Sequence, residues 1–197
     1  MALTKSAVTA IIAKGTSNAA FTQLTGCSVT RSGTTATLTK TSHGRSNGDK
    51  VLIQGFSLVE FNGVFTVANA AANTFDYTIS ADPGANPSGT PGTVDLVTLG
   101  TALDLTGSYA AELYGGLQNG TSAPGAVAEI WMGVSASSTE SAFIWSRVAA
   151  GDLTANSWTP FRHIPGQARM WVNFAVGRNT TNAVDCFILG TTITAMV

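Results

Sequence analysis

The sequence is poor in ionisable side chains. Only 11% of its 197 residues are Asp, Glu, Lys or Arg, whereas soluble globular proteins usually carry about 25%. Thr, Ser, Asn and Gly must therefore keep the surface polar. Hydroxyl and amide groups cost less to desolvate than charged groups when they are buried against another protein. The composition favours a subunit of an assembly.

The chain also lacks a run of basic residues, and its net charge is −1 with a pI of about 6.0. No field of one sign is present to attract a polyanion. No apolar stretch approaches the roughly 20 residues that a helix needs to span a bilayer. We therefore expect no nucleic-acid partner and no membrane partner.

Cysteine is scarce. Cys27 and Cys186 are the only two, and they fall in different predicted parts of the chain, so no disulfide framework is indicated. Two free, at least half-buried thiols are typical of a protein made and assembled in a reducing host cytoplasm. A disulfide between the two is the less favoured alternative.

Groups for catalysis or metal binding are few. His43 and His163 are the only imidazoles, and their distance from each other and from the cysteines gives no metal-ligand spacing. The Ser-His-Gly turn around His43 predicts a structural hydrogen bond, while the prolines around His163 favour packing or an interface. No phosphate-binding loop is present. We therefore expect that the protein is not an enzyme and that it binds no cofactor and no metal ion.

Glycoside cleavage would require a pair of carboxylates that share one cleft. The candidate carboxylates are isolated, and strand alternation places no two of them in an obvious common cleft. We interpret them as solvated edge or turn residues: Asp104, Glu112, Glu129, Glu140, Asp152 and Asp185.

Clusters of Gly, Pro, Asn and Asp recur about every 8 to 15 residues, which leaves room for strands and little room for helices. One weak helical pattern lies near 6–13. Residues 168–176 carry apolar side chains at every second position, which predicts a half-buried strand. The sequence thus predicts an all-β fold. Further strands are expected at 35–39, 50–53, 64–67, 75–79, 110–117, 127–134, 143–148, 158–163 and 184–194.

The stretch from Asp82 to Gly92 is the richest in Pro and Gly, and we interpret it as a linker or long loop near a domain boundary. The first 25 residues carry one or two strands with a break at 15–18, and they are too short to fold alone. We therefore predict two domains. Residues 1–25 and 98–197 form a β-sandwich, and residues 26–97 are inserted into it.

Four sequence blocks follow one another between residues 28 and 79: SVTRSGTTATLTKTSHG, NGDKVLIQGF, EFNGVFTV and NTFDYTI. Together they resemble a small β-barrel module that recurs in phage tail and other virion proteins. The module is labelled as similar to the first catalytic-cysteine half-domain of ubiquitin-activating enzyme. The resemblance covers about a quarter to a third of the chain and implies a phage context. Cys27 lies at the edge of the module without a nearby His or basic residue, so we do not expect a catalytic thiol.

The residues of these blocks have structural roles in their own right. Val51 and Ile53 point to one side as core, Asn62-Gly63 predicts a tight hairpin turn, and Phe75 and Tyr77 help to close the barrel. From residue 103 to the strand at 127, the chain more loosely resembles small β-sandwich proteins of phage structural gene clusters. That resemblance implies a jelly-roll-like sandwich.

All four tryptophans lie in the C-terminal part of the chain. We expect most of these rings in the core, with one or two at a protein interface or a sugar-stacking surface. Trp171 is the leading interface candidate, since it lies opposite the apolar face of its strand and close to Arg169. His163 and Phe161 complete the predicted interface.

These observations predict a structural protein of a bacteriophage virion. The favoured role is a decoration or cement subunit on the capsid exterior, bound to the major capsid protein as a homo-oligomer such as a trimer. The alternative is a tail or baseplate component with a receptor- or glycan-binding role. The expected location is the virion.

Overall fold

The computed structural model describes residues 4–5, 9–18, 23–89, 91–107, 110–119, 126–153, 159–163, 170–178 and 184–194. In these residues the chain forms strands and two short 3₁₀ turns, so the predicted all-β class is confirmed. The strands are β1 Thr4–Lys5, β2 Thr9–Asn18, β3 Leu24–Ser32, β4 Thr35–Thr39, β5 Lys50–Gln54, β6 Gly63–Thr66, β7 Thr74–Thr78, β8 Gly92–Leu99, β9 Leu103–Asp104, β10 Ala110–Asn119, β11 Ala126–Ser135, β12 Ile144–Leu153, β13 Thr159–His163, β14 Trp171–Arg178 and β15 Val184–Thr194. The turns are η1 Val59–Phe61 and η2 Glu140–Ala142.

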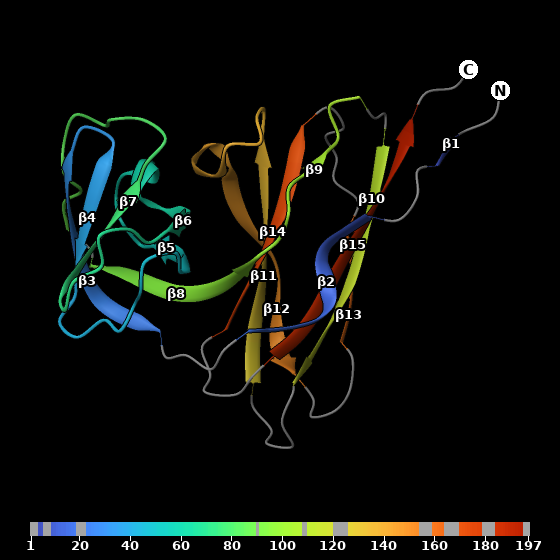
Figure 1. Cartoon of the computed structure of the whole chain (residues 1–197), viewed down its shortest axis with the longest axis horizontal. Helices are drawn as coiled ribbons and strands as arrows, with labels where there is room; N and C mark the ends of the chain where they lie inside the picture. Colours follow the sequence, from blue (N-terminus) through green and yellow to red (C-terminus); the bar gives the residue numbers. More distant parts are fainter. Residues whose placement is uncertain are drawn as a thin grey trace. The chain divides into compact units, whose positions relative to one another are not determined.

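The chain divides into two compact units (Figure 1). One contains Met1–Phe21 and Thr98–Val197, and the other contains Thr22–Val97. We call them the sandwich and the module. The sequence places the first boundary at 25/26, and in the structure it lies at 21/22. Strand β8 runs across the second boundary, with its last two residues in the sandwich.

Strand pairing in the sandwich is nested. The hairpin β11–β12 is innermost, and around it β10 pairs with β13, β9 with β14, and β2 with β15. The pairs β10–β15 and β11–β14 then assemble two antiparallel sheets, ordered β2-β15-β10-β13 and β12-β11-β14-β9, with β1 also on β15. A long nested hairpin folded into two sheets is the jelly roll. The predicted jelly-roll-like sandwich is therefore confirmed.

The core of the sandwich contains apolar side chains from both sheets. Val172, Phe174 and Val176 of β14 are fully buried, as their alternation predicts. The opposite face of β14 is also buried, with Asn173 at 6% and Ala175 at 0% exposure, so the prediction of a half-buried strand is wrong here. The reason is its neighbours on that face: Ala175 lies opposite Trp131, and Asn173 lies opposite Gly133, over which the ring of Trp145 packs. The buried cluster contains Ile11, Ile12, Leu105, Leu113, Ile130, Val172, Phe174, Val176 and Ile188.

The module is a small antiparallel barrel with strand order β7-β4-β3-β8-β5-β6. A bridge between Ala68, just after β6, and Asp76 of β7 closes the ring. The rings of Phe65 and Tyr77 pack across the same seam with centroids 4.6 Å apart. Closure leaves no long open edge, which is how small β-barrels avoid unwanted strand pairing.

Three local expectations differ from the structure. Strand β2 continues through 15–18 without the predicted break, and no helix occurs in the described part of 6–13. Asn62-Gly63 is not a two-residue hairpin turn, because the β5–β6 connection is longer and contains η1. The side chain of Asn62 instead holds this connection: Phe56 N–H donates to Oδ1, and Nδ2 donates to the carbonyls of Phe56 and Leu58, each at 2.9 Å.

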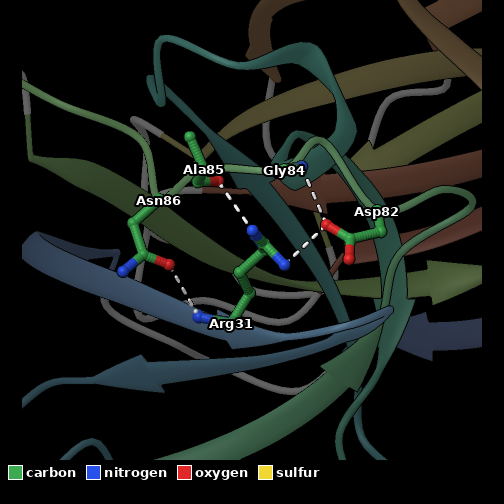
Figure 2. A network of polar contacts seen from close by, with 5 residues as sticks. All are labelled: Arg31, Asp82, Gly84, Ala85 and Asn86. Carbon is green, nitrogen blue, oxygen red and sulfur yellow. Dashed lines mark hydrogen bonds and ion pairs between the residues drawn. The ribbon is translucent and has the colours of Figure 1, made fainter.

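The Pro- and Gly-rich stretch after β7 is a loop within the module, anchored on Arg31 of β3 (Figure 2). The Arg31 guanidinium contacts Asp82 at 2.6 Å and donates to the Ala85 carbonyl at 3.2 Å, while its backbone N–H donates to the Asn86 side chain at 2.9 Å. Asp82 also accepts the Gly84 N–H at 2.8 Å. The stretch is therefore a long loop and not a linker between the units.

Candidate interaction surfaces

The predicted interface residues lie on two different sheets of the sandwich. Trp171 is half-buried at the start of β14, opposite Asp104 of β9 and Ser135 of β11. Phe161 and His163 lie on β13, the edge strand of the other sheet, opposite Gly115 and Leu113 of β10. Arg169 lies outside the described residues. Trp171 therefore lies at the end of its strand beside two polar residues. A common interface formed by Trp171, Arg169, His163 and Phe161 stays a prediction.

Asp104, the neighbour of Trp171, is held as a carboxylate. Thr106 donates to its Oδ1 through both the side-chain hydroxyl, at 2.6 Å, and the backbone N–H, at 2.8 Å. These two bonds lower the pKa of Asp104, with the hydroxyl contributing more. An exposed anion is thus fixed beside Trp171.

Further aromatic side chains lie on β11 and β12, on the same face of this sheet as Trp171, and the sequence did not single them out. The indole N–H of Trp131 donates to Glu129 Oε2 at 3.0 Å, and the other oxygen of Glu129 pairs with Arg147 at 3.0 Å. Trp131 lies opposite Arg147 in the register. One carboxylate therefore orients both an indole and a guanidinium on a partly exposed face, and Trp and Arg are typical of binding surfaces.

The ring of Trp145 lies on the same face, over Gly133. A Cβ at Gly133 would come within 2.9 Å of Trp145 and 3.0 Å of Phe143, so only glycine permits this packing. The rings of Phe143 and Trp145 contact each other with centroids 5.8 Å apart. We call Glu129, Trp131, Trp145 and Arg147 the aromatic face.

The module carries a different kind of surface, made by the outward side chains of β3, β4 and β7. The strand register places nine of them in three rows of three. Eight are Ser or Thr, and six are exposed while three are partly buried. The rows are Ser28-Thr39-Thr74, Thr30-Thr37-Asp76 and Ser32-Thr35-Thr78. We call this the hydroxyl face.

The one carboxylate of the hydroxyl face is engaged within it. Thr37 donates its hydroxyl to Asp76 Oδ1 at 2.6 Å, and Asn69 donates to Oδ2 at 2.9 Å. Hydroxyl groups both donate and accept hydrogen bonds. The face therefore offers many neutral hydrogen-bonding groups and no cation among its nine positions.

Beneath the module surface lie the two residues whose side chains could take part in catalysis, a cysteine and a histidine. Both are buried and have structural roles. Cys27 is fully buried. The fold brings the basic residues Lys40 and Arg45 near it, which the sequence did not predict, but burial raises the pKa of the thiol more than these charges lower it. The thiol is therefore not activated as a nucleophile. The imidazole of His43 is 3% exposed and lies between the Arg45 N–H, at 2.9 Å, and the Thr74 carbonyl, at 3.0 Å. This is the structural hydrogen bonding that the turn predicts.

Polar groups also meet where the chain enters and leaves the module. Asp95 of β8 is 5% exposed and accepts a 2.6 Å hydrogen bond from Gln23, which precedes β3. Burial lowers the pKa of Arg45, while the negative charges of Asp49 and Asp95 act in the opposite direction.

Among the described residues, no three His, Cys, Asp or Glu side chains group as metal ligands, and no helix could cross a membrane.

No protein-family model matches the chain, and no curated protein sequence matches it. Several chains of solved structures show a distant likeness, and three of them illustrate it. Two N-terminal modules of a Clostridium thermocellum endo-1,4-β-D-xylanase, complexed with xylohexaose, are 11% identical over 76% of this chain and 27% of that one, with a TM-score of 0.37. An Arthrobacter globiformis isomalto-dextranase complexed with panose is 14% identical over 86% and 34%, with a TM-score of 0.30.

The third structure is that of infectious bursal disease virus, Gx strain. It is 13% identical over 86% of this chain and 58% of that one, with a TM-score of 0.33. The chain thus spans between about a quarter and three fifths of the length of these structures. Because all three likenesses are distant, the jelly-roll assignment rests on the strand pairing described above.

Proposed function

We propose that the chain is a structural protein of a phage virion, most specifically a decoration or cement subunit that binds the assembled capsid. The hydroxyl face is the observation that carries this proposal. Its nine positions include no cation and one carboxylate that is already hydrogen-bonded. Such a face can be buried on a protein shell at a low desolvation cost.

The mechanism would be mass action. A subunit that binds the assembled shell and not its free components stabilises the shell by RT ln(1 + [L]/Kd), about 4 kcal/mol per site at a thousandfold excess over Kd. Many weak, neutral contacts suit this role because their effect is multiplied over every site on the shell.

The direct test is to purify particles of the phage that encodes the chain and to measure its copy number by quantitative mass spectrometry and cryo-electron microscopy. A decoration subunit is present at a number comparable to that of the major capsid protein. A few copies confined to the tail, or absence from the particle, would contradict the proposal.

A charge placed in the hydroxyl face tests the surface itself. We expect Thr30→Lys to weaken binding to purified shells by at least about tenfold, roughly 1.4 kcal/mol, because an ammonium group must be desolvated on docking. Ser138→Lys, at an exposed position of the sandwich, is the matched control and should bind like the unmodified protein. Equal binding by all three proteins would exclude the hydroxyl face as the docking surface.

The aromatic face favours a second candidate function, glycan or receptor binding by a tail or baseplate component. Partly exposed Trp131 and Trp145 with Glu129 and Arg147 combine stacking surfaces with hydrogen-bonding groups. Titration with neutral oligosaccharides, followed by tryptophan fluorescence, tests this function. Saturable quenching that Trp131→Ala abolishes would support it, and no change up to millimolar sugar would exclude it.

A further inference from the structure

An open sheet edge exposes a row of backbone N–H and C=O groups that can pair with another strand, so proteins usually protect such edges. Most edges among the described strands of the sandwich are protected. Strand β13 has five residues, and its Pro160 has no N–H to donate. Strand β2 pairs with β15 through two irregularities, and its Ile11 carbonyl accepts the Thr101 N–H at 2.8 Å.

Strand β12 differs from these edges. It is ten residues long and contains no proline, and β11 is the one described strand that pairs with it. An irregularity in the pairing lies between Arg147 and Ala149, so residues 144–147 form a regular segment at its start. This segment presents an extended backbone whose second side has no described strand beside it.

An apolar side chain marks the same segment. Ile144 lies opposite Val134, which packs against the sandwich core, and yet Ile144 is 73% exposed. Met132, opposite Ser146, also packs against the core. The apolar layer of the sandwich therefore reaches this edge at Ile144, where it is uncovered. A strand added beside β12 would extend the sheet and cover this side chain.

We propose that the occupant is a second copy of this chain, docked through antiparallel pairing of β12 with β12. A two-fold dimer uses the same edge of both copies, so the backbone groups of one β12 pair with those of the other. No such edge is then left open for a third copy. Charge does not oppose it, since the one cation of segment 144–147, Arg147, is already paired with Glu129 of its own chain. The product is a dimer in place of the trimer expected from the sequence, and it is independent of the proposed function.

The test is the molar mass of the full chain in solution, measured by analytical ultracentrifugation at micromolar to hundred-micromolar concentration. The unmodified protein should have twice the 20.2 kDa mass of one chain. Ile144→Lys and Ser146→Lys should halve that mass, because a lysine on an edge strand opposes pairing. Circular dichroism verifies that both variants remain folded.

Val59 provides the matched control, because it is 72% exposed on a turn and not on a sheet edge. Val59→Lys should leave the dimer intact, which separates edge pairing from general hydrophobic association. Backbone amides of 144–147 should also exchange more slowly in the unmodified protein than in Ile144→Lys. A monomeric unmodified protein, a trimer, or a dimer that survives both edge substitutions would overturn the proposal.

Discussion

Single side chains in the module stabilise backbone that has no strand partner. His43 accepts the Arg45 N–H at Nδ1, so Nε2 carries the ring hydrogen and donates to the Thr74 carbonyl. Asn62 uses both ends of its amide to hold the β5–β6 connection. At this scale both residues act as hydrogen-bonding supports, which is the role that the sequence predicts for His43.

Asn62→Ala should destabilise the module by about 1–3 kcal/mol, since it leaves buried or half-buried backbone groups without partners. Val59→Ala, on the same turn and largely exposed, should change the free energy of unfolding by less than about 0.5 kcal/mol. Urea unfolding followed by far-UV circular dichroism measures both. Equal effects of the two substitutions would show that the Asn62 hydrogen bonds contribute little.

Cys27 should resist thiol reagents at pH 8 in a Cys186→Ala variant, because the side chain is fully buried and burial raises its pKa. The folded pKa lies above the unfolded value of about 8.5. Stability is therefore unaffected by this group below that pH and falls as the pH rises above it, when only the unfolded thiol ionises. Absorbance with a disulfide reagent, before and after addition of urea, follows the reaction. Rapid labelling of the folded variant would contradict the burial.

Strands whose apolar and polar residues alternate regularly could be predicted from the sequence. Strands with few apolar residues, or directly beside a Pro- and Gly-rich loop, could not. Strands β4 and β15 have the predicted bounds. The sequence did not predict β3 or β8: β3 has few apolar residues besides Cys27 and Val29, and β8 begins directly after a Pro- and Gly-rich loop. The hydroxyl face could not be predicted either, because its rows can be identified only once the register of three strands is known.

The packing of Trp145 on Gly133 makes β11 intolerant of a side chain at that position. Gly133→Ala should destabilise the sandwich by about 1–3 kcal/mol, since the new methyl group overlaps the indole. Gly107→Ala is the control, because a Cβ at that position would meet no heavy atom within 4 Å. Tryptophan fluorescence during urea unfolding measures both variants. A Gly133→Ala protein as stable as the control would mean that the ring moves aside at little cost.

For the whole molecule, the chain has two compact units, and in the module the first strand, β3, pairs with the last, β8. Leu24 pairs with Val94, and Gln23 donates to Asp95. All four tryptophans belong to residues 98–197, so tryptophan fluorescence reports the sandwich, whereas circular dichroism reports both units. The unfolding of each unit can therefore be followed in one protein.

Residues 22–97, expressed alone, should fold cooperatively, because their core and their barrel closure lie within that range. A dispersed amide NMR spectrum and a sigmoidal urea transition are the expected results. Residues 22–91, which lack β8, should be unfolded since β8 pairs with both β3 and β5. A disordered 22–97 fragment would show that the module depends on the rest of the chain.

The nested strand order also has a consequence for biosynthesis. Strand β2 leaves the ribosome before the module and most of the sandwich, but its partner β15 is the last described strand to be made. The module, which is encoded between them, can fold while translation continues. The nascent sandwich must meanwhile keep β2 unpaired, so the slow, non-local step of folding is the closing of the outermost pair after synthesis of β15.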